Sequence, residues 1–245
     1  MPNRHGAHCS TSTSNPNLIF MSTQEIGELS SISESSRISA EELANVITHA
    51  LGAIGAVFAT FFLVLYASVN APEECLVAAT TGFAVFGASM FILYTISAIY
   101  HSIRSEKLKA TFKVLDHCAI YLLISGSYTA FALTLLPNWI GWTIFGVNWA
   151  LALTGIFIYA GLGNHSKYIS MTLYLLMGWL IIFALKPLLD AAPTTVIHFL
   201  VCGGVSYTAG CFFYLKKNCA WSHPVWHLFV LGGSIFHFFS AWYIY

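Results

Sequence analysis

The most constraining feature of this sequence is a series of seven apolar segments of about 20 residues each, which begins near residue 44. A helix rises about 1.5 Å per residue, so a segment of this length crosses the ~30 Å hydrocarbon core of a membrane. In lipid, backbone polar groups must bond within their own segment, and the runs lack the alternation of barrel strands, so helices are expected. The predicted spans are residues 44–66, 76–100, 114–136, 139–162, 168–189, 194–215 and 223–244.

The composition favours a multi-pass protein of the cell membrane and excludes several soluble classes. Charged residues make up 8% of the chain, whereas soluble proteins use about 25%. The formal net charge is zero, so no excess of cations is available to neutralise phosphates, and nucleic acid is excluded as a partner. The short connections between spans predict antiparallel neighbours in one all-α, seven-helix bundle.

Residues 1–40 form a separate block that is rich in Ser, Thr and Asn. They lack the apolar core of a signal peptide, so we interpret them as a flexible polar cytoplasmic tail before a seven-helix transmembrane domain over residues 41–245. Nine of the ten Lys and Arg residues fall on the same side of the membrane as this tail, and only Lys186 falls on the other. The positive-inside rule therefore predicts a cytoplasmic N-terminus and an external C-terminus.

Ionisable side chains inside membrane spans are costly to bury and usually functional. His101 lies at the cytoplasmic end of the second span, and Ser97 lies one turn deeper on the same face. Asp116 lies near the cytoplasmic start of the third span. His223 and His227 lie in the cytoplasmic half of the seventh. Three helices are therefore expected to bring a serine, three histidines and an aspartate to one level of the inner leaflet.

The segment HPVWH over residues 223–227 places two imidazoles four residues apart, on one face of a helix. Pro224 is tolerated in a first turn, and Ser222 is a candidate N-cap before it. Together with His101, the pair would supply three nitrogen ligands and leave one tetrahedral position for water, the pattern of a catalytic zinc site. Zinc is the first choice for a nitrogen-rich site without thiolates, with iron and manganese as alternatives.

Asp116 has two roles open to it in such a site. It could bind the metal directly, or it could hydrogen-bond the metal-bound water and take its proton during attack on a carbonyl. Ser97 would be a supporting group or a hydrogen-bond donor to the developing oxyanion. A structural alternative pairs Asp116 with His49, which lies in the same leaflet.

Several other histidines are predicted to lie outside this site. His237 is 14 residues beyond His223, about 21 Å along the helix, and is interpreted as a satisfied polar residue of the opposite leaflet. His198 begins the sixth span on the outer side. His117 follows Asp116 but is expected to point about 100° away from it.

Four segments of the chain are distinctive, namely EELANVITHALG (41–52), SAIYHS (97–102), KVLDHCAIYLLISGSYTAF (113–131) and HPVWHLFVLGGSIFHF (223–238). Together they resemble the signature motifs of the hemolysin III family, the bacterial branch of the progestin and adipoQ receptor group, which is related to the alkaline ceramidases. The resemblance covers the chain from residue 41 to its end. It implies a multi-pass protein of the bacterial inner membrane with seven helices and a cytoplasmic N-terminus.

The resemblance also implies a zinc ion held by three histidines, which correspond to His101, His223 and His227. It implies that Asp116 contacts a zinc-bound water, with Ser97 beside it. Supporting roles are implied for three residues that match the family's first-span motif: Glu42, Asn45 and His49. The same Ser, His, Asp and HxxxH set occurs in alkaline ceramidases, which hydrolyse the amide of a lipid.

These observations predict a membrane-embedded, zinc-dependent hydrolase that cleaves an amide or ester bond of a lipid or other amphipathic substrate. The substrate would enter sideways between helices, and aromatic and leucine side chains would form its acyl chamber. The alternative is a receptor or regulator in which zinc is structural and clamps the second, third and seventh helices. A pore-forming hemolysin ranks below both, because few buried charges are available to line an aqueous channel.

Overall fold

The structure is a computed structural model that describes residues 39–163, 166–216 and 219–245. Within these residues the fold contains helices and no β-strand, which confirms the predicted all-α class. The predicted tail over residues 1–40 falls almost entirely outside the described residues. The elements are α2 (Ala40–Asn70), η1 (Glu73–Cys75), α3 (Leu76–Ser102), α4 (Glu106–Leu135), α5 (Trp139–Ile156), η2 (Phe157–Gly161), α6 (Lys167–Gly178), η3 (Leu180–Ala184), α7 (Leu185–Ala191), α8 (Thr194–Leu215) and α9 (Ser222–Trp242).

In the described part of the chain, seven helical stretches are long and apolar enough to cross a membrane, in agreement with the prediction. α5 and the π-helical turn η2 form one stretch, and α6, η3 and α7 form another. Two helices begin earlier than predicted, α2 at Ala40 and α4 at Glu106. The start of α2 is capped by Ser39, whose side chain accepts the N–H of Glu42 at 3.1 Å. Both helices therefore begin in polar segments that precede the apolar runs.

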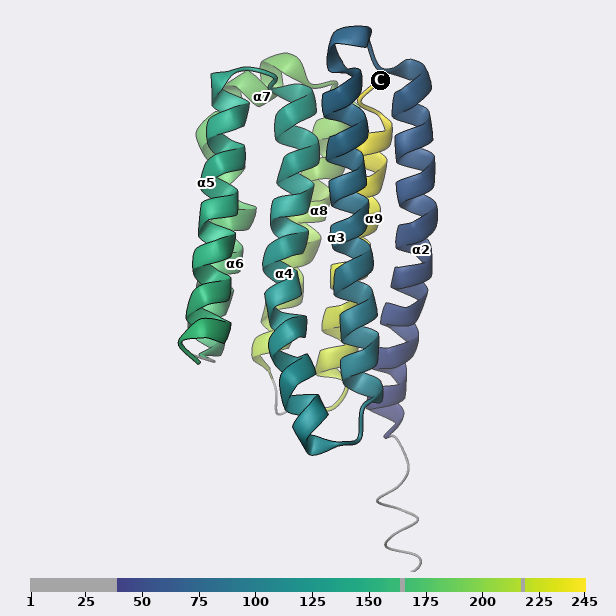
Figure 1. The fold of residues 1–245 in the computed structure, drawn as a ribbon, viewed down its shortest axis with the longest axis vertical. Coiled ribbons are helices and arrows are strands. Elements are labelled where there is room, and N and C mark those ends of the chain that lie inside the picture. The colour runs from purple at the N-terminus through teal and green to yellow at the C-terminus, as the bar shows by residue number, and fades with distance from the viewer. Residues whose placement is uncertain (1–38, 164–165, 217–218) are drawn as a thin grey trace, which may run out of the picture. The chain divides into compact units, whose positions relative to one another are not determined.

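The spans pack mainly against their neighbours in the sequence, and α9 closes the bundle against α2 (Figure 1). α4 is the most buried span. Small residues allow α2, α3 and α4 to approach closely. A Cβ at Gly87 of α3 would lie 1.9 Å from Thr60 Oγ1 of α2, and a Cβ at Gly126 of α4 would lie 2.2 Å from Ser89 Oγ of α3. These contacts hold together the helices that carry most of the predicted site residues.

The span formed by α6, η3 and α7 is interrupted near its middle. The hydroxyl of Tyr128 donates to the carbonyl of Gly178 at 3.0 Å and accepts the N–H of Ile181 at 2.9 Å. Asn148 Nδ2 donates to the carbonyl of Met177 at 3.1 Å. Side chains of α4 and α5 thus satisfy backbone groups where the regular helix breaks, as membrane burial requires. This interrupted span makes few contacts with α8.

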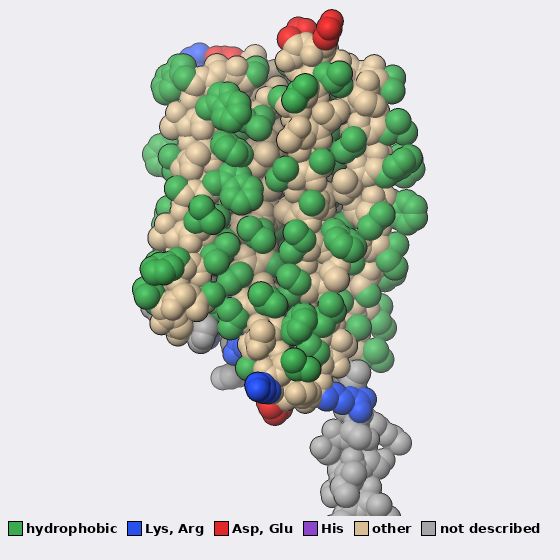
Figure 2. Space-filling model, in the orientation of Figure 1, with side chains coloured by type: hydrophobic (Ala, Val, Ile, Leu, Met, Phe, Trp, Pro, Cys, Tyr) green, Lys and Arg blue, Asp and Glu red, His purple; other side chains and the backbone are tan. Residues whose placement is uncertain are grey.

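Apolar side chains cover the side of the bundle shown in Figure 2, and basic side chains gather at the end where α2 begins. We call this the basic end. Lys186, the second residue of α7, lies at the opposite end. The other described basic residues lie at or near the basic end: Arg104, Lys107, Lys109, Lys113, Lys167 and Lys216. That the basic end faces the cytoplasm stays a prediction from the positive-inside rule.

Candidate metal centre

Three histidines meet near the basic end of the bundle. His101 is the penultimate residue of α3, and His223 and His227 lie in the first two turns of α9. One ring nitrogen from each lies within 4.8 Å of the other two, so the set could hold a metal ion. His101 Nε2 and His223 Nε2 are 3.2 Å apart. Two nitrogens bound to one tetrahedral zinc ion at ~2.05 Å would lie ~3.3 Å apart, which agrees with this distance.

His227 has the environment expected of a ligand. Its side chain is fully buried, and its Nε2 has no hydrogen-bond partner among the described residues. Its Nδ1 lies 3.5 Å from Thr48 Oγ1. A buried nitrogen without a partner is unfavourable by about 1–3 kcal/mol, and a bound cation would remove that cost. The three-nitrogen donor set suits a borderline transition metal rather than magnesium or calcium, which prefer oxygen.

Glu42 fixes the orientation of His101. Its Oε2 lies 2.5 Å from His101 Nδ1, and its Oε1 accepts a hydrogen bond from Lys109 Nζ at 2.9 Å. Asn45 Nδ2 lies 3.4 Å from both Glu42 Oε2 and His101 Nδ1. A carboxylate at Nδ1 holds the ring proton there and leaves the Nε2 lone pair directed toward the other histidines. The structure therefore brings two of the three predicted supporting residues onto one ligand.

Replacing Glu42 with Gln is expected to weaken metal binding by about 10–100-fold, because a neutral amide holds the Nδ1 proton of His101 more weakly than a carboxylate. Competition with a chromogenic chelator measures the change in affinity. Glu106→Gln is the matched control, since Glu106 is an exposed carboxylate at the same end of the bundle. Equal affinities for the two variants would show that Glu42 does not orient the ligand.

His49, for which a supporting role was predicted without a mechanism, packs against the cluster. Its ring stacks on that of His227, with centroids 3.6 Å apart and planes at 6°, and it forms a T-shaped contact with the ring of Tyr94 at 5.1 Å. Neither ring nitrogen has a hydrogen-bond partner in the described part of the chain. No ion pair joins His49 to Asp116 among the described residues, so the proposed structural pairing was wrong.

Asp116 lies beside the histidine cluster and not within it. Its side chain is buried, and it is absent from the set of mutually close ligand atoms among the described residues. Its carboxylate interacts with the Ser97 hydroxyl, although the two groups form no hydrogen bond of standard geometry. Of the two roles left open for Asp116, this placement favours action on water or substrate over direct ligation.

His117 lies closer to Asp116 than the sequence suggested. Its Nδ1 is 3.6 Å from Asp116 Oδ2 and donates to the carbonyl of Lys113 at 2.8 Å. Its Nε2 is 3.1 Å from the hydroxyl of Tyr214. The 100° separation of consecutive helix positions was a poor guide, because the two adjacent side chains lean toward each other. His117 remains outside the three-histidine set.

The turn before α9 presents His223 to the cluster. The predicted N-cap was wrong, since Ser222 is the first residue of the helix and Trp221 precedes it without a side-chain cap. Trp221 has a left-handed backbone, with φ of 64°, which is unfavourable for a bulky residue. Its N–H donates to Glu41 Oε1 at 2.9 Å. Adjacent carboxylates of α2, Glu41 and Glu42, therefore contact two different parts of the site.

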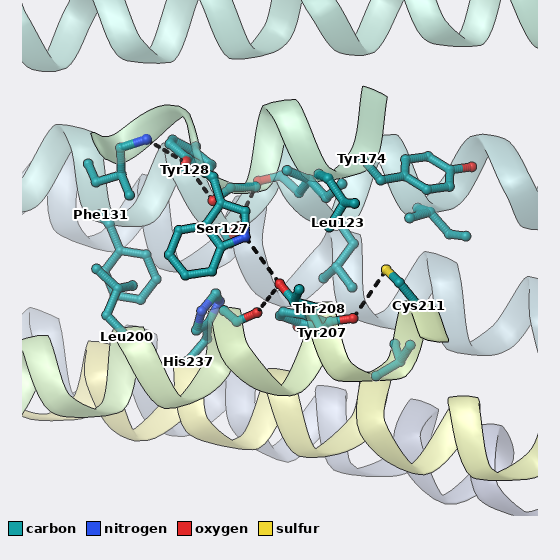
Figure 3. Close-up of a pocket in the computed structure, with 18 of the residues that line it drawn as sticks. Leu123, Ser127, Tyr128, Phe131, Tyr174, Leu200, Tyr207, Thr208, Cys211 and His237 are labelled. Carbon is teal, nitrogen blue, oxygen red and sulfur yellow. Dashed lines mark hydrogen bonds between the residues drawn. The ribbon is translucent and has the colours of Figure 1, made fainter. Parts of the chain in front are cut away.

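A cavity of about 200 Å³ begins beside this cluster and is lined mainly by apolar side chains of α4, α6, α8 and α9. Asp116 and His49 line one end, and Phe131 and Ala132 line the other. Figure 3 shows Phe131 beside Leu200 and His237, away from Tyr174 and Cys211. The distance from Asp116 to Ala132 along α4 is about 24 Å at 1.5 Å per residue. Since one water needs about 10–15 Å³ of such space, the cavity has room for an extended chain.

The chain matches a sequence model of the family described as Haemolysin-III related over residues 38–238. It is 42% identical over 201 residues to Hemolysin-3 of Bacillus cereus, which covers 82% of this chain and 90% of the relative. It is 39% identical over 201 residues to the Hemolysin-3 homolog of Bacillus subtilis, which covers 82% and 92%. It is 26% identical over 220 residues to the human Monocyte to macrophage differentiation factor, which covers 82% and 83%.

Proposed function

This chain belongs to the hemolysin III family of multi-pass bacterial membrane proteins, and we propose that it hydrolyses an amide or ester bond of a lipid-like substrate with the help of zinc. One observation carries the proposal: a long apolar cavity ends at a buried carboxylate beside three clustered histidines. Three nitrogen ligands leave one tetrahedral position for water or substrate. When bound there, zinc supplies Lewis acidity, which polarises a carbonyl and makes water more acidic.

In this proposal the metal is held by His101, His223 and His227. Asp116 is the acid–base group, because it is buried, lines the cavity and lies outside the ligand set. Its carboxylate accepts a proton from the attacking water and returns it to the leaving amine or alcohol. The Ser97 hydroxyl, which has no other partner among the described residues, orients this carboxylate or donates to the carbonyl oxygen as it gains charge.

The first-span residues support this chemistry from α2. Glu42 and Asn45 orient His101 through its Nδ1. His49 holds the ring of His227 by stacking, and it also lines the cavity. Its unpartnered ring nitrogens are therefore available to hydrogen-bond the polar group of a substrate that lies against Asp116.

The substrate enters the cavity sideways, from the membrane. Ile182 of η3 and Val201 of α8 line the cavity and are also 54% and 49% exposed on the outside of the bundle. The interrupted span contacts α8 sparsely at this boundary, where Trp179 Nε1 donates to Thr208 Oγ1 at 3.1 Å. An acyl chain that passes between these elements stays in apolar surroundings throughout, while the carbonyl to be hydrolysed reaches Asp116.

The proposal is tested by incubating the purified protein in detergent with synthetic N-acyl amides and O-acyl esters of long-chain fatty acids. Mass spectrometry of released fatty acid measures hydrolysis. Removal of metal with phenanthroline is expected to abolish release, zinc is expected to restore it, and magnesium is not, because the donor set contains nitrogen and no oxygen. Release that persists after complete removal of metal would contradict the zinc requirement.

A further inference from the structure

The far end of the cavity carries an imidazole that the proposed hydrolysis does not use. His237 lies on α9, ten residues beyond His227 and about 15 Å further along the helix. It lines the same cavity as Asp116 (Figure 3). The residue is 9% exposed, and its Nδ1 has no hydrogen-bond partner in the described part of the chain. The interpretation of His237 as a satisfied interior residue is therefore wrong for this nitrogen.

The surrounding helices pack closely against the ring of His237. It meets Phe131 edge to face at 5.6 Å and Tyr207 at 5.4 Å. On the other side it packs against α8, where it interacts with the carbonyl of Leu200. A Cβ at Gly203 would lie 2.1 Å from Cδ2 of His237, so only glycine lets α8 approach the ring this closely.

The hydroxyl groups near His237 are already engaged with other partners. Tyr207 and Ser234 share a hydrogen bond of 2.8 Å between their hydroxyls, and the Tyr94 hydroxyl donates to Ser234 Oγ at 2.6 Å. Thr208 donates to a carbonyl of its own helix at 2.7 Å. None of these hydroxyls has a described hydrogen bond to His237. Each of these hydroxyls therefore has a partner already, whereas Nδ1 of the imidazole has none among the described residues.

We propose that His237 is a second polar subsite of the cavity, which binds a hydroxyl group carried on the acyl chain of the substrate. A buried nitrogen without a partner is unfavourable, and a ligand hydroxyl removes that cost. Because the ring interacts with the Leu200 carbonyl, the imidazole proton is held at Nε2 and Nδ1 is an acceptor, so a ligand hydroxyl fits by donating its proton to Nδ1. Among the described residues, the aromatic side chains around His237 provide no charged group that could pair with a carboxylate or an ammonium group of a ligand.

The rise along α9 from His227, the histidine of the cluster nearer to His237, sets the position of this hydroxyl. The inference rests on the proposed function for one point, that the substrate carbonyl lies at the metal centre. An extended chain advances about 1.2 Å per bond, so 15 Å corresponds to about 12 bonds. The hydroxyl is therefore expected near carbon 12 of the acyl chain.

The test compares octadecanoic acid with its 12-hydroxy and 2-hydroxy derivatives as ligands of the full chain in detergent. Trp179 and Trp226 line the cavity, so intrinsic fluorescence reports binding. Wild type is expected to bind the 12-hydroxy acid about five- to tenfold more tightly than octadecanoic acid, as one added hydrogen bond allows. His237→Leu is expected to lose this preference and to bind octadecanoic acid within about twofold of wild type.

His237→Gln is the matched variant, because its amide keeps a donor and an acceptor and should retain part of the preference. Thermal unfolding shows whether each variant folds. The preference for the 12-hydroxy over the 2-hydroxy acid is measured on the wild-type protein, so it does not depend on the folding of any variant. Equal binding of the three acids by wild type, or an unchanged preference in His237→Leu, overturns the subsite. Binding needs no turnover, so a preserved preference with no hydrolysis would reject only the proposed function.

Discussion

Purified His227→Ala protein is expected to contain no zinc, whereas the wild-type protein is expected to contain about one zinc ion per chain. His227 is fully buried beside His101 and His223, and its removal leaves two nitrogen ligands where a mononuclear site needs three. Mass-spectrometric metal analysis of protein purified without chelator measures the content. His101→Ala is expected to behave in the same way, although its side chain comes from α3 and not from α9.

His198→Ala is the matched control, since His198 is an exposed histidine at the start of α8, away from the cluster. It is expected to keep its zinc. Bound zinc stabilises the fold by mass action, by about 2.7 kcal/mol when its concentration is 100 times Kd, so the zinc-free variants should also unfold at lower temperature. A full complement of zinc in His227→Ala would rule out the three-histidine centre.

The number of spans could be predicted from the sequence because the bilayer fixes the length of an apolar helix. Their ends could not, as the early starts of α2 and α4 show, because polar residues continue a helix outside the hydrocarbon. The break between α6 and α7 was also missed. Residues 168–189 form one apolar run in the sequence. The side chains that hydrogen-bond the backbone at the break belong to Tyr128 and Asn148, which come from other helices.

The level of the three histidines could be predicted because their distances from basic loop residues set their depth in the membrane. The contacts around them depend on how helices rotate against one another, which spacing does not reveal. The contact of Glu42 with His101 needs α2 packed on α3, and the stacking of His49 on His227 needs α2 packed on α9. The family resemblance named these residues, but it did not give their separate roles.

Replacing Asp116 with Asn is expected to leave zinc content and folding unchanged and to lower hydrolysis by about 10²–10⁴-fold. Asn has nearly the same shape and can still interact with Ser97, but it cannot accept a proton from water. Asp116 also lies outside the mutually close ligand atoms, so the three histidines keep their donor set. Metal analysis, thermal unfolding and fatty-acid release measure the three properties on one preparation.

Asp190→Asn provides the control, because Asp190 is an exposed carboxylate paired with Lys186 away from the metal centre, and it should change none of the three properties. The combination of results separates a hydrolase from a receptor or regulator. A structural metal needs its ligands but no neighbouring base. If the protein is a receptor, Asp116→Asn would therefore keep its zinc and stability, and neither the wild type nor the variant would hydrolyse the substrate. Selective loss of turnover at full zinc content is expected only if the carboxylate moves a proton.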